Sequence, residues 1–124
     1  MKSYKEGIIR VAPPLSSQCL TLEIYLLDMK SYYVYILTSK HNKALYIGIT
    51  SNLTKRIWEH KNKVISGFTS KYNVQKLVYF EVFQDVGSAL NREKLLKSWK
   101  REWKIDLVER ENPNWADLYD EITK

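Results

Sequence analysis

At 124 residues the chain has room for one domain with a modest hydrophobic core, and its 44% hydrophobic residues exclude a chain that is disordered throughout. The formal net charge of +6 favours an anionic partner, most often nucleic acid, although charge alone does not separate such a protein from a merely soluble basic one. The single cysteine, Cys19, excludes an internal disulfide, and no apolar run reaches the ~18 residues of a membrane-spanning helix. We therefore expect a cytoplasmic protein without membrane contact.

Positive charge is concentrated in the middle of the chain. Residues 55–104 contain twelve Lys or Arg against five Asp or Glu, whereas residues 105–124 carry a net charge of −4. A uniformly solvated surface does not require this segregation. The distribution therefore favours nucleic acid as the partner of the central segment.

Residues 1–28 lack the regular pattern of the rest. Pro13-Pro14 and Ser16-Ser17 interrupt them, and the tetrapeptide MKSY occurs at residues 1–4 and again at 29–32. Met29 is thus a candidate second translation start. We expect a poorly ordered extension over 1–28 and one domain over 29–124; a real extension with a short strand or helix at 20–27 is the alternative.

From residue 32 onward the pattern becomes regular. Aromatic and β-branched residues predict strands at 32–39, 44–50 and 76–83, with a turn at 39–43 between the first two. Apolar stripes and capping residues predict a helix at 51–65 capped by Ser51 or Asn52, and a long helix at 85–110 with a break near Lys104. A loop is expected at 66–74, and a short helix capped by Asn114 at 114–122. This order predicts an α/β domain with a small three-stranded, largely antiparallel sheet flanked by helices.

The second strand alternates Leu45, Ile47 and Ile49 with Tyr46, Gly48 and Thr50. Since side chains alternate across a strand, burial of the apolar set would present Tyr46 on the opposite face, together with Tyr35 of the first strand. Gly48 would leave space there for close approach of another group. A tyrosine in a strand is by itself explained by β-propensity.

Arg56 and His60 lie four residues apart on the first helix and so point the same way. An arginine at such a place can bind a phosphate through its fork of donors, and a histidine can shuttle a proton. A solvated helix face explains the pair equally simply.

Glu93 falls within the apolar stripe of the long helix, which we assign to Val86, Ala89, Leu96, Trp99, Trp103 and Leu107. A carboxylate among apolar side chains costs free energy unless it is paired or binds a cation. One interpretation is a salt bridge with Arg92 or Lys97. The other is an oxygen ligand for a hard divalent metal, which often takes one or two protein carboxylates plus water and phosphate.

Basic residues around these positions form a candidate phosphate-binding surface. We assign it to Lys55, Arg56, Lys97, Lys100 and Arg101. Trp99 and Trp103 alternate with the last three, and the apolar stripe indicates that these two rings belong to the core.

Taken together, these residues resemble the GIY-YIG nuclease superfamily, and more closely its small single-domain members related to the nuclease domain of the excision-repair UvrC subunit. The resemblance covers roughly residues 30–121. The first motif is imperfect, with Tyr33 and Val34 before the retained Tyr35, whereas the second, Tyr46-Ile47-Gly48, is intact. Arg56, His60 and Glu93 match the family's arginine, its frequent histidine and its metal-binding glutamate; Asn112 matches a late asparagine only insecurely.

The resemblance implies a metal-dependent endonuclease that hydrolyses phosphodiester bonds in DNA, in repair or processing. Glu93 would hold one Mg²⁺ or Mn²⁺, Arg56 would stabilise charge on the phosphate, and Tyr46, with His60, would position or deprotonate the attacking water. Tyr35 would aid positioning or proton transfer. Two alternatives remain open: a non-catalytic nucleic-acid-binding module with the same fold, and a nuclease subunit that needs a targeting protein partner.

Overall fold

The computed structural model describes residues 31–123, so the expectations for residues 1–28 lie outside the described residues. Three antiparallel strands form a sheet in the order β2-β1-β3: β1 (Tyr32–Thr38), β2 (Leu45–Thr50) and β3 (Lys76–Phe83). The helices are α2 (Leu53–Lys61), α3 (Phe68–Lys71), α4 (Val86–Ser98), α5 (Arg101–Glu111) and α6 (Tyr119–Ile122). This confirms the expected α/β fold class. No helix within residues 31–123 has the length and apolarity needed to cross a bilayer.

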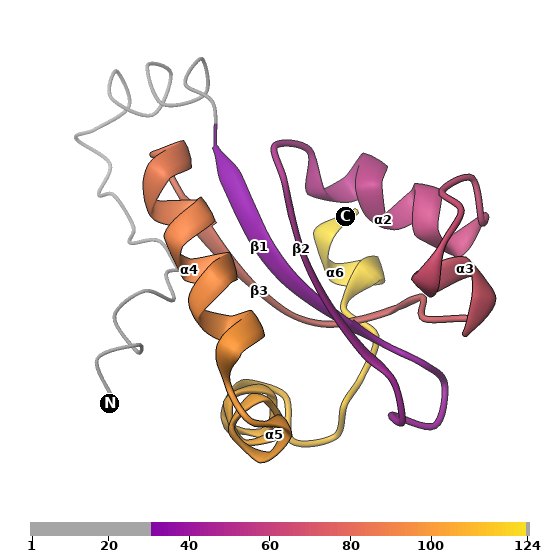
Figure 1. Cartoon of the computed structure of the whole chain (residues 1–124). Coiled ribbons are helices and arrows are strands. Elements are labelled where there is room, and N and C mark those ends of the chain that lie inside the picture. Colours follow the sequence, from indigo (N-terminus) through magenta and orange to yellow (C-terminus); the bar gives the residue numbers. More distant parts are fainter. Residues whose placement is uncertain (1–30, 124) are drawn as a thin grey trace.

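Both faces of the sheet are buried, whereas we expected one apolar and one open face. On one face Val34, Ile36 and Ile47 pack against Ala89 and Leu96 of α4. Figure 1 shows α4 and α5 on this side and α2, α3 and α6 on the other. Each fully buried aliphatic side chain contributes about 1.5–3 kcal/mol of transfer free energy, so the two layers hold the central strand β1 firmly.

The second face carries its own core, built by Tyr35 and Leu37 of β1 with Leu53 and Ile57 of α2. Tyr35 therefore belongs to a buried layer and not to an open surface. This face is partly uncovered at Tyr33, Tyr46 and Phe80, which are half-buried; of these, Tyr46 lies on the edge strand β2.

Helix α2 begins where the sequence predicts and ends earlier than predicted. Asn52 caps α2, as expected, because its side-chain oxygen accepts from the Lys55 backbone N–H. The helix stops at Lys61 and not at 65, so Val64 leaves the apolar stripe and is 62% exposed. A single helical turn, α3, replaces part of the expected loop.

The long C-terminal helix is broken earlier than expected. Trp99 and Lys100 have extended backbone, with ψ of 155° and 156°, so α4 and α5 are separate helices. The Ser98 hydroxyl donates to the Leu95 carbonyl at 2.7 Å, which competes with helix continuation. The break turns Trp99 into the core, whereas Trp103 is exposed, contrary to our assignment.

The last helix begins at Tyr119 and has Leu118 at its N-cap, so the expected cap at Asn114 is wrong. Asn112 has a structural role: its amide donates to the Val78 and Ala116 carbonyls, and its oxygen accepts from the Ala116 N–H. These bonds attach the end of α5 to β3.

Candidate active site

Tyr35 and Gly48 face each other across the β1–β2 ladder. The phenol ring of Tyr35 lies directly over Gly48: a Cβ at position 48 would overlap the Tyr35 hydroxyl and lie 2.5 Å from its Cζ. The glycine thus provides the close approach that the alternation of β2 predicted. It allows a fully buried tyrosine to lie flat on the neighbouring strand.

The Tyr35 hydroxyl leads into a chain of hydrogen bonds. It is bonded to Nε2 of His60 at 3.2 Å, and Nδ1 of His60 is bonded to the Thr69 hydroxyl at 2.9 Å. Because each hydroxyl can donate or accept, this chain accommodates either tautomer of His60. Residues from β1, α2 and α3 therefore form one buried hydrogen-bonded network.

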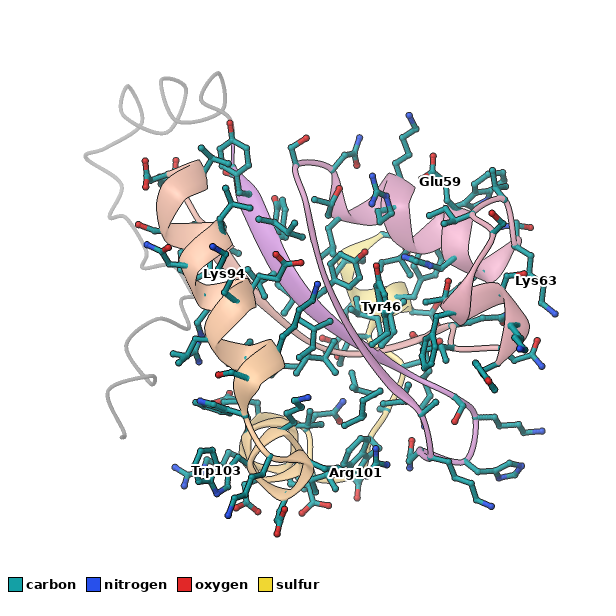
Figure 2. The ribbon with its side chains drawn as sticks, viewed as in Figure 1. Tyr46, Glu59, Lys63, Lys94, Arg101 and Trp103 are labelled. Carbon is teal, nitrogen blue, oxygen red and sulfur yellow. The ribbon has the colours of Figure 1, made fainter. Side chains whose placement is uncertain are left out.

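Tyr46 lies against this network through ring contacts, on its solvent side. Its ring lies on the same face as Tyr35, with centroids 6.3 Å apart, and 5.7 Å from the His60 ring. The predicted shared face of the two tyrosines is therefore present. Tyr46 is half-buried, and Figure 2 shows it between β2 and the α2–α3 layer.

Burial sets the protonation states inside this cluster. Burial raises the pKa of Tyr35, followed in size by the nearby Tyr46, while Arg56 opposes the rise. Burial also lowers the pKa of His60, and the positive charge of Arg56 adds to that effect. At neutral pH the Tyr35 phenol is thus protonated and the His60 imidazole is uncharged.

Arg56 lies at the solvent edge of the cluster. Its side chain is 40% exposed and its Nε is 3.3 Å from Oε1 of Glu59. Its positive charge opposes the rise in the pKa of Tyr35 and adds to the fall in the pKa of His60; the effect on His60 agrees with the four-residue spacing of the two residues on α2. An exposed ion pair of this kind is weak, so the guanidinium can exchange Glu59 for a phosphate.

Glu93 lies on α4, which covers the face of the sheet opposite to the Tyr35–His60 cluster. Its negative charge contributes to the raised pKa of Tyr35. Its carboxylate pairs with Lys97 at 3.1 Å, so the salt bridge weighed from the sequence exists, with Lys97 as the partner. Lys97 in turn lines a hollow of about 290 Å³ together with Tyr46, Phe68 and Lys104.

The Glu93 carboxylate is an oxygen ligand of the kind that hard divalent cations take. Within residues 31–123 no group of three His, Cys, Asp or Glu forms a cluster that could hold a metal. Mg²⁺ is often bound by one or two carboxylates, with water and substrate phosphates completing the shell. The Glu93 side chain is 15% exposed and pairs with a Lys97 that is itself 54% exposed. A one-carboxylate site at Glu93 is therefore chemically compatible with Mg²⁺ or Mn²⁺.

The remaining members of the expected phosphate-binding surface have varied surroundings. Lys55 is exposed and lies 3.9 Å from Glu59. The Lys100 ammonium lies 5.6 Å from the Trp103 ring centroid. Arg101 donates to the backbone carbonyls of residues 42 and 43, which attaches α5 to the β1–β2 hairpin. Arg101 thus has a structural contact that sequence reasoning did not anticipate.

Sequence reasoning also missed Thr69, which holds His60 from the other side. Residues 66–74 contain Gly67 and Ser66 and were assigned to a loop. The available signal was weak: Phe68 and Tyr72 are four residues apart, as on a helix face, within a segment that is otherwise typical of a turn.

Comparisons with known proteins identify relatives for most of the described chain. A family model described as the GIY-YIG catalytic domain matches residues 31–106. A UPF0213 protein of Clostridium perfringens is 42% identical over 76 residues, which cover 61% of this chain and 81% of that protein. A UPF0213 protein of Syntrophus aciditrophicus is 36% identical over 86 residues, covering 68% of this chain and 97% of that protein.

A solved structure is also similar. The solution NMR structure of a UPF0213 protein from Bacillus halodurans has 26% sequence identity and a TM-score of 0.47, and the match covers 70% of this chain and 92% of that one.

Proposed function

The chain belongs to the GIY-YIG catalytic domain family, a nuclease superfamily, and on this premise we propose that it is a divalent-metal-dependent endonuclease that hydrolyses phosphodiester bonds in DNA. A role in DNA repair or processing and a cytoplasmic location are part of the same proposal. So is weak sequence preference, since contacts to phosphate carry no sequence information.

One observation carries the proposal: side chains from three separate elements meet beside an open hollow. Tyr35 comes from β1, Tyr46 from β2 and His60 from α2, and their rings lie within 5.7–6.3 Å of one another. Arg56 lies at their solvent edge. Burying a histidine costs free energy unless its nitrogens are hydrogen-bonded, and here the Tyr35 and Thr69 hydroxyls supply both bonds beside the exposed side chains of the site.

The exposure of each side chain decides whether it can touch the substrate. Arg56 and the half-buried Tyr46 can touch substrate, with the Arg56 guanidinium binding a phosphate oxygen and the Tyr46 hydroxyl orienting the attacking water. His60 is 2% exposed and Tyr35 fully buried, so both are positioning residues that act through Tyr46. The neutral His60 is the group that can receive a proton passed inward.

Glu93 would hold the metal ion. The bound cation would neutralise charge on the phosphate and on the leaving oxygen. In its absence Lys97 neutralises the carboxylate through a pair four residues apart on one helix, worth about 0.3–0.5 kcal/mol, which is little resistance to a divalent ion.

A plasmid-nicking assay with Mg²⁺ or Mn²⁺ tests the proposal. We expect Glu93→Gln and Arg56→Ala each to lower the nicking rate by about a hundred-fold or more, because each removes a charge that acts on the developing anion. Tyr46→Phe should lower it by about a hundred-fold, within the range of general acid–base contributions.

The matched control is Glu102→Gln, which makes the same chemical change at an exposed position on α5. It should nick DNA as the parent does. Equal nicking by Glu93→Gln and the parent would point to a contaminating nuclease and remove the catalytic claim. DNA binding without cleavage under any metal would favour a non-catalytic binding module.

A further inference from the structure

Helix α3 presents two different faces. Its one turn follows Gly67, whose φ of 112° and ψ of −149° lie in a region that only glycine adopts easily. On the inner face Thr69 is 3% exposed and bonded to His60. On the outer face Phe68 and the following Tyr72 are 46% and 49% exposed. The active-site hydrogen bond therefore fixes a turn that holds two aromatic rings in solvent.

These two rings continue the aromatic series of the site. Tyr46 and Phe68 are stacked, with centroids 6.3 Å apart and an interplanar angle of 23°. Phe68 and Tyr72 follow at 4.9 Å. Exposed aromatic side chains normally cost solubility, and their alignment from Tyr46 outward is not needed by either buried core of the sheet. The series leads from the candidate active site to the surface of α3.

Basic hollows lie at both ends of this series. Lys97 and Lys104 line the hollow that Tyr46 shares with Phe68. At the far end Tyr72 lines a larger hollow of about 560 Å³ with Lys40, Lys61 and Lys76. Lys61 is paired with Asp117 at 2.5 Å. Within residues 31–123 neither Lys40 nor Lys76 forms an ion pair, so both ammonium groups are available to an anion.

We propose that Phe68 and Tyr72 form a stacking platform for unpaired bases of single-stranded DNA, whose phosphates bind in the lysine-lined hollows on either side. The inference deepens the proposed nuclease function, on which its link to catalysis rests, by naming an unpaired segment beside the cleaved bond as the substrate feature. Positive grooves combined with aromatic rings are the chemistry by which proteins hold single strands. A base pair inside a duplex offers no free face to these rings, because its neighbours stack on it.

Binding without cleavage isolates the platform from catalysis. The probe is a fluorescently labelled oligo(dT) of about a dozen nucleotides, within the site sizes of known single-strand grooves, titrated with the full chain in EDTA and followed by anisotropy. The competitors are a duplex of the same length, oligo(U), and a strand of abasic sites that keeps the phosphates and lacks the bases. We expect oligo(dT) to bind about five-fold or more tightly than the duplex and the abasic strand, since stacking contributes only to the first.

Substitutions assign the effect to the two rings. Phe68→Ala and Tyr72→Ala should each raise the Kd for oligo(dT) by about five-fold to a hundred-fold and leave the abasic strand unaffected. Phe68→Tyr should keep the parent affinity, and Phe68→Leu should not, because leucine keeps the apolar bulk without the π-face. Trp58→Ala is the matched control, since Trp58 is 50% exposed on α2 and lies outside the series.

The contribution of the lysine-lined hollows is measured separately, by the salt dependence of the Kd. Lys40→Gln and Lys76→Gln should each reduce the slope of log Kd against log salt by about 0.7, the value per phosphate contact on a single strand. Their effect should be the same for oligo(dT) and for the abasic strand.

Several outcomes overturn the platform. Equal affinity for oligo(dT) and the abasic strand, or an unchanged Kd in Phe68→Ala, would remove base stacking. Tighter binding of oligo(U) would assign the surface to RNA, and tighter binding of the duplex would assign it to paired DNA. Loss of a dimer in Phe68→Ala, seen by size-exclusion chromatography, would make it a contact between copies of this chain. Base stacking on oligo(dT) without plasmid nicking would refute only the proposed nuclease function. Nicking without base stacking would refute only the platform.

Discussion

Each face of the sheet buries a polar cluster, and the two clusters differ in their access to solvent. We call the one around Glu81 the closed cluster and the one around His60 the open cluster. On the α4 side Glu81 is fully buried, and the Arg92 guanidinium donates to both of its oxygens at 2.8 Å. The Tyr79 hydroxyl donates to the same carboxylate at 2.7 Å. Partners within the chain therefore pair this buried carboxylate on both of its oxygens.

On the α2 side the buried groups are neutral and the network opens to solvent. His60 lies between Tyr35 and Thr69, and the cluster ends at the half-buried Tyr46. Burial raises the pKa of both Tyr35 and Tyr79; the next largest cause is Tyr46 for the first and the Glu81 carboxylate for the second. The comparison teaches that a closed ion pair specifies structure, whereas an uncharged relay with an exposed end is suited to chemistry.

The largest effect should come from breaking the closed cluster. Arg92→Ala leaves Glu81 buried without its cation and should lower the free energy of unfolding by about 3–5 kcal/mol, measured by urea titration. Arg56→Ala is the comparison, because that arginine is 40% exposed and forms its ion pair with Glu59 at the surface. It should cost about 1 kcal/mol or less. Similar losses for the two variants would contradict the distinction between the clusters.

The sequence predicted one of these clusters and not the other, for a physical reason. Alternation along β2 is a local periodicity, and it correctly placed Tyr35, Tyr46 and Gly48 on one face. The four-residue spacing put His60 on the same side of α2 as Arg56, and the family resemblance joined that pair to the tyrosines. Glu81 sits at a strand position like any other, and its partner lies eleven residues further along the chain on a different element. Only the packing of α4 on the sheet brings the two together.

The same limit explains the boundaries that were wrong. Helical periodicity continues through Trp99, yet the chain extends there because the ring packs into the core of the α4 face. Thr69 lies in a segment rich in turn residues, and its value depends on the tertiary contact with His60. Local pattern thus gave the strands and the site-bearing helix, whereas contacts between elements decided where helices end and which buried groups are paired.

An intermediate effect should follow from filling the space over the open cluster. Gly48→Ala places a methyl group against the ring of the fully buried Tyr35, so the ring must move. We expect a loss of about 1–3 kcal/mol in the free energy of unfolding, as in other overpacked cores. Reduced nicking should accompany it, because the Tyr35–His60 hydrogen bond is displaced.

Gly87→Ala in α4 is the matched control. A Cβ there would approach only the exposed Asp85 carboxylate, at 3.2 Å, and alanine favours a helix. Its stability should change by about 1 kcal/mol or less. An equal cost for the two substitutions would mean that Tyr35 does not hold Gly48 tightly.

The smallest expected effect is the pH dependence that His60 gives to the free energy of unfolding. It tests whether the open cluster is uncharged, unlike the Glu81–Arg92 pair. Because burial and then Arg56 lower its pKa, the unfolded chain takes up a proton at this residue before the folded chain does. The contribution to stability is therefore complete above about pH 6.5, the ordinary value, and is lost as the pH falls through the lower pKa of the folded state.

Urea titrations at a series of pH values below and above this point measure the effect as a difference between parent and His60→Gln. The parent should lose stability relative to the variant on acidification, while the exposed His41→Gln should follow the parent. Arg56→Ala should reduce the loss, because removal of the neighbouring cation lets the pKa of His60 rise toward its ordinary value. If His60→Gln loses stability on acidification as steeply as the parent does, then the histidine is not the neutral member of this network.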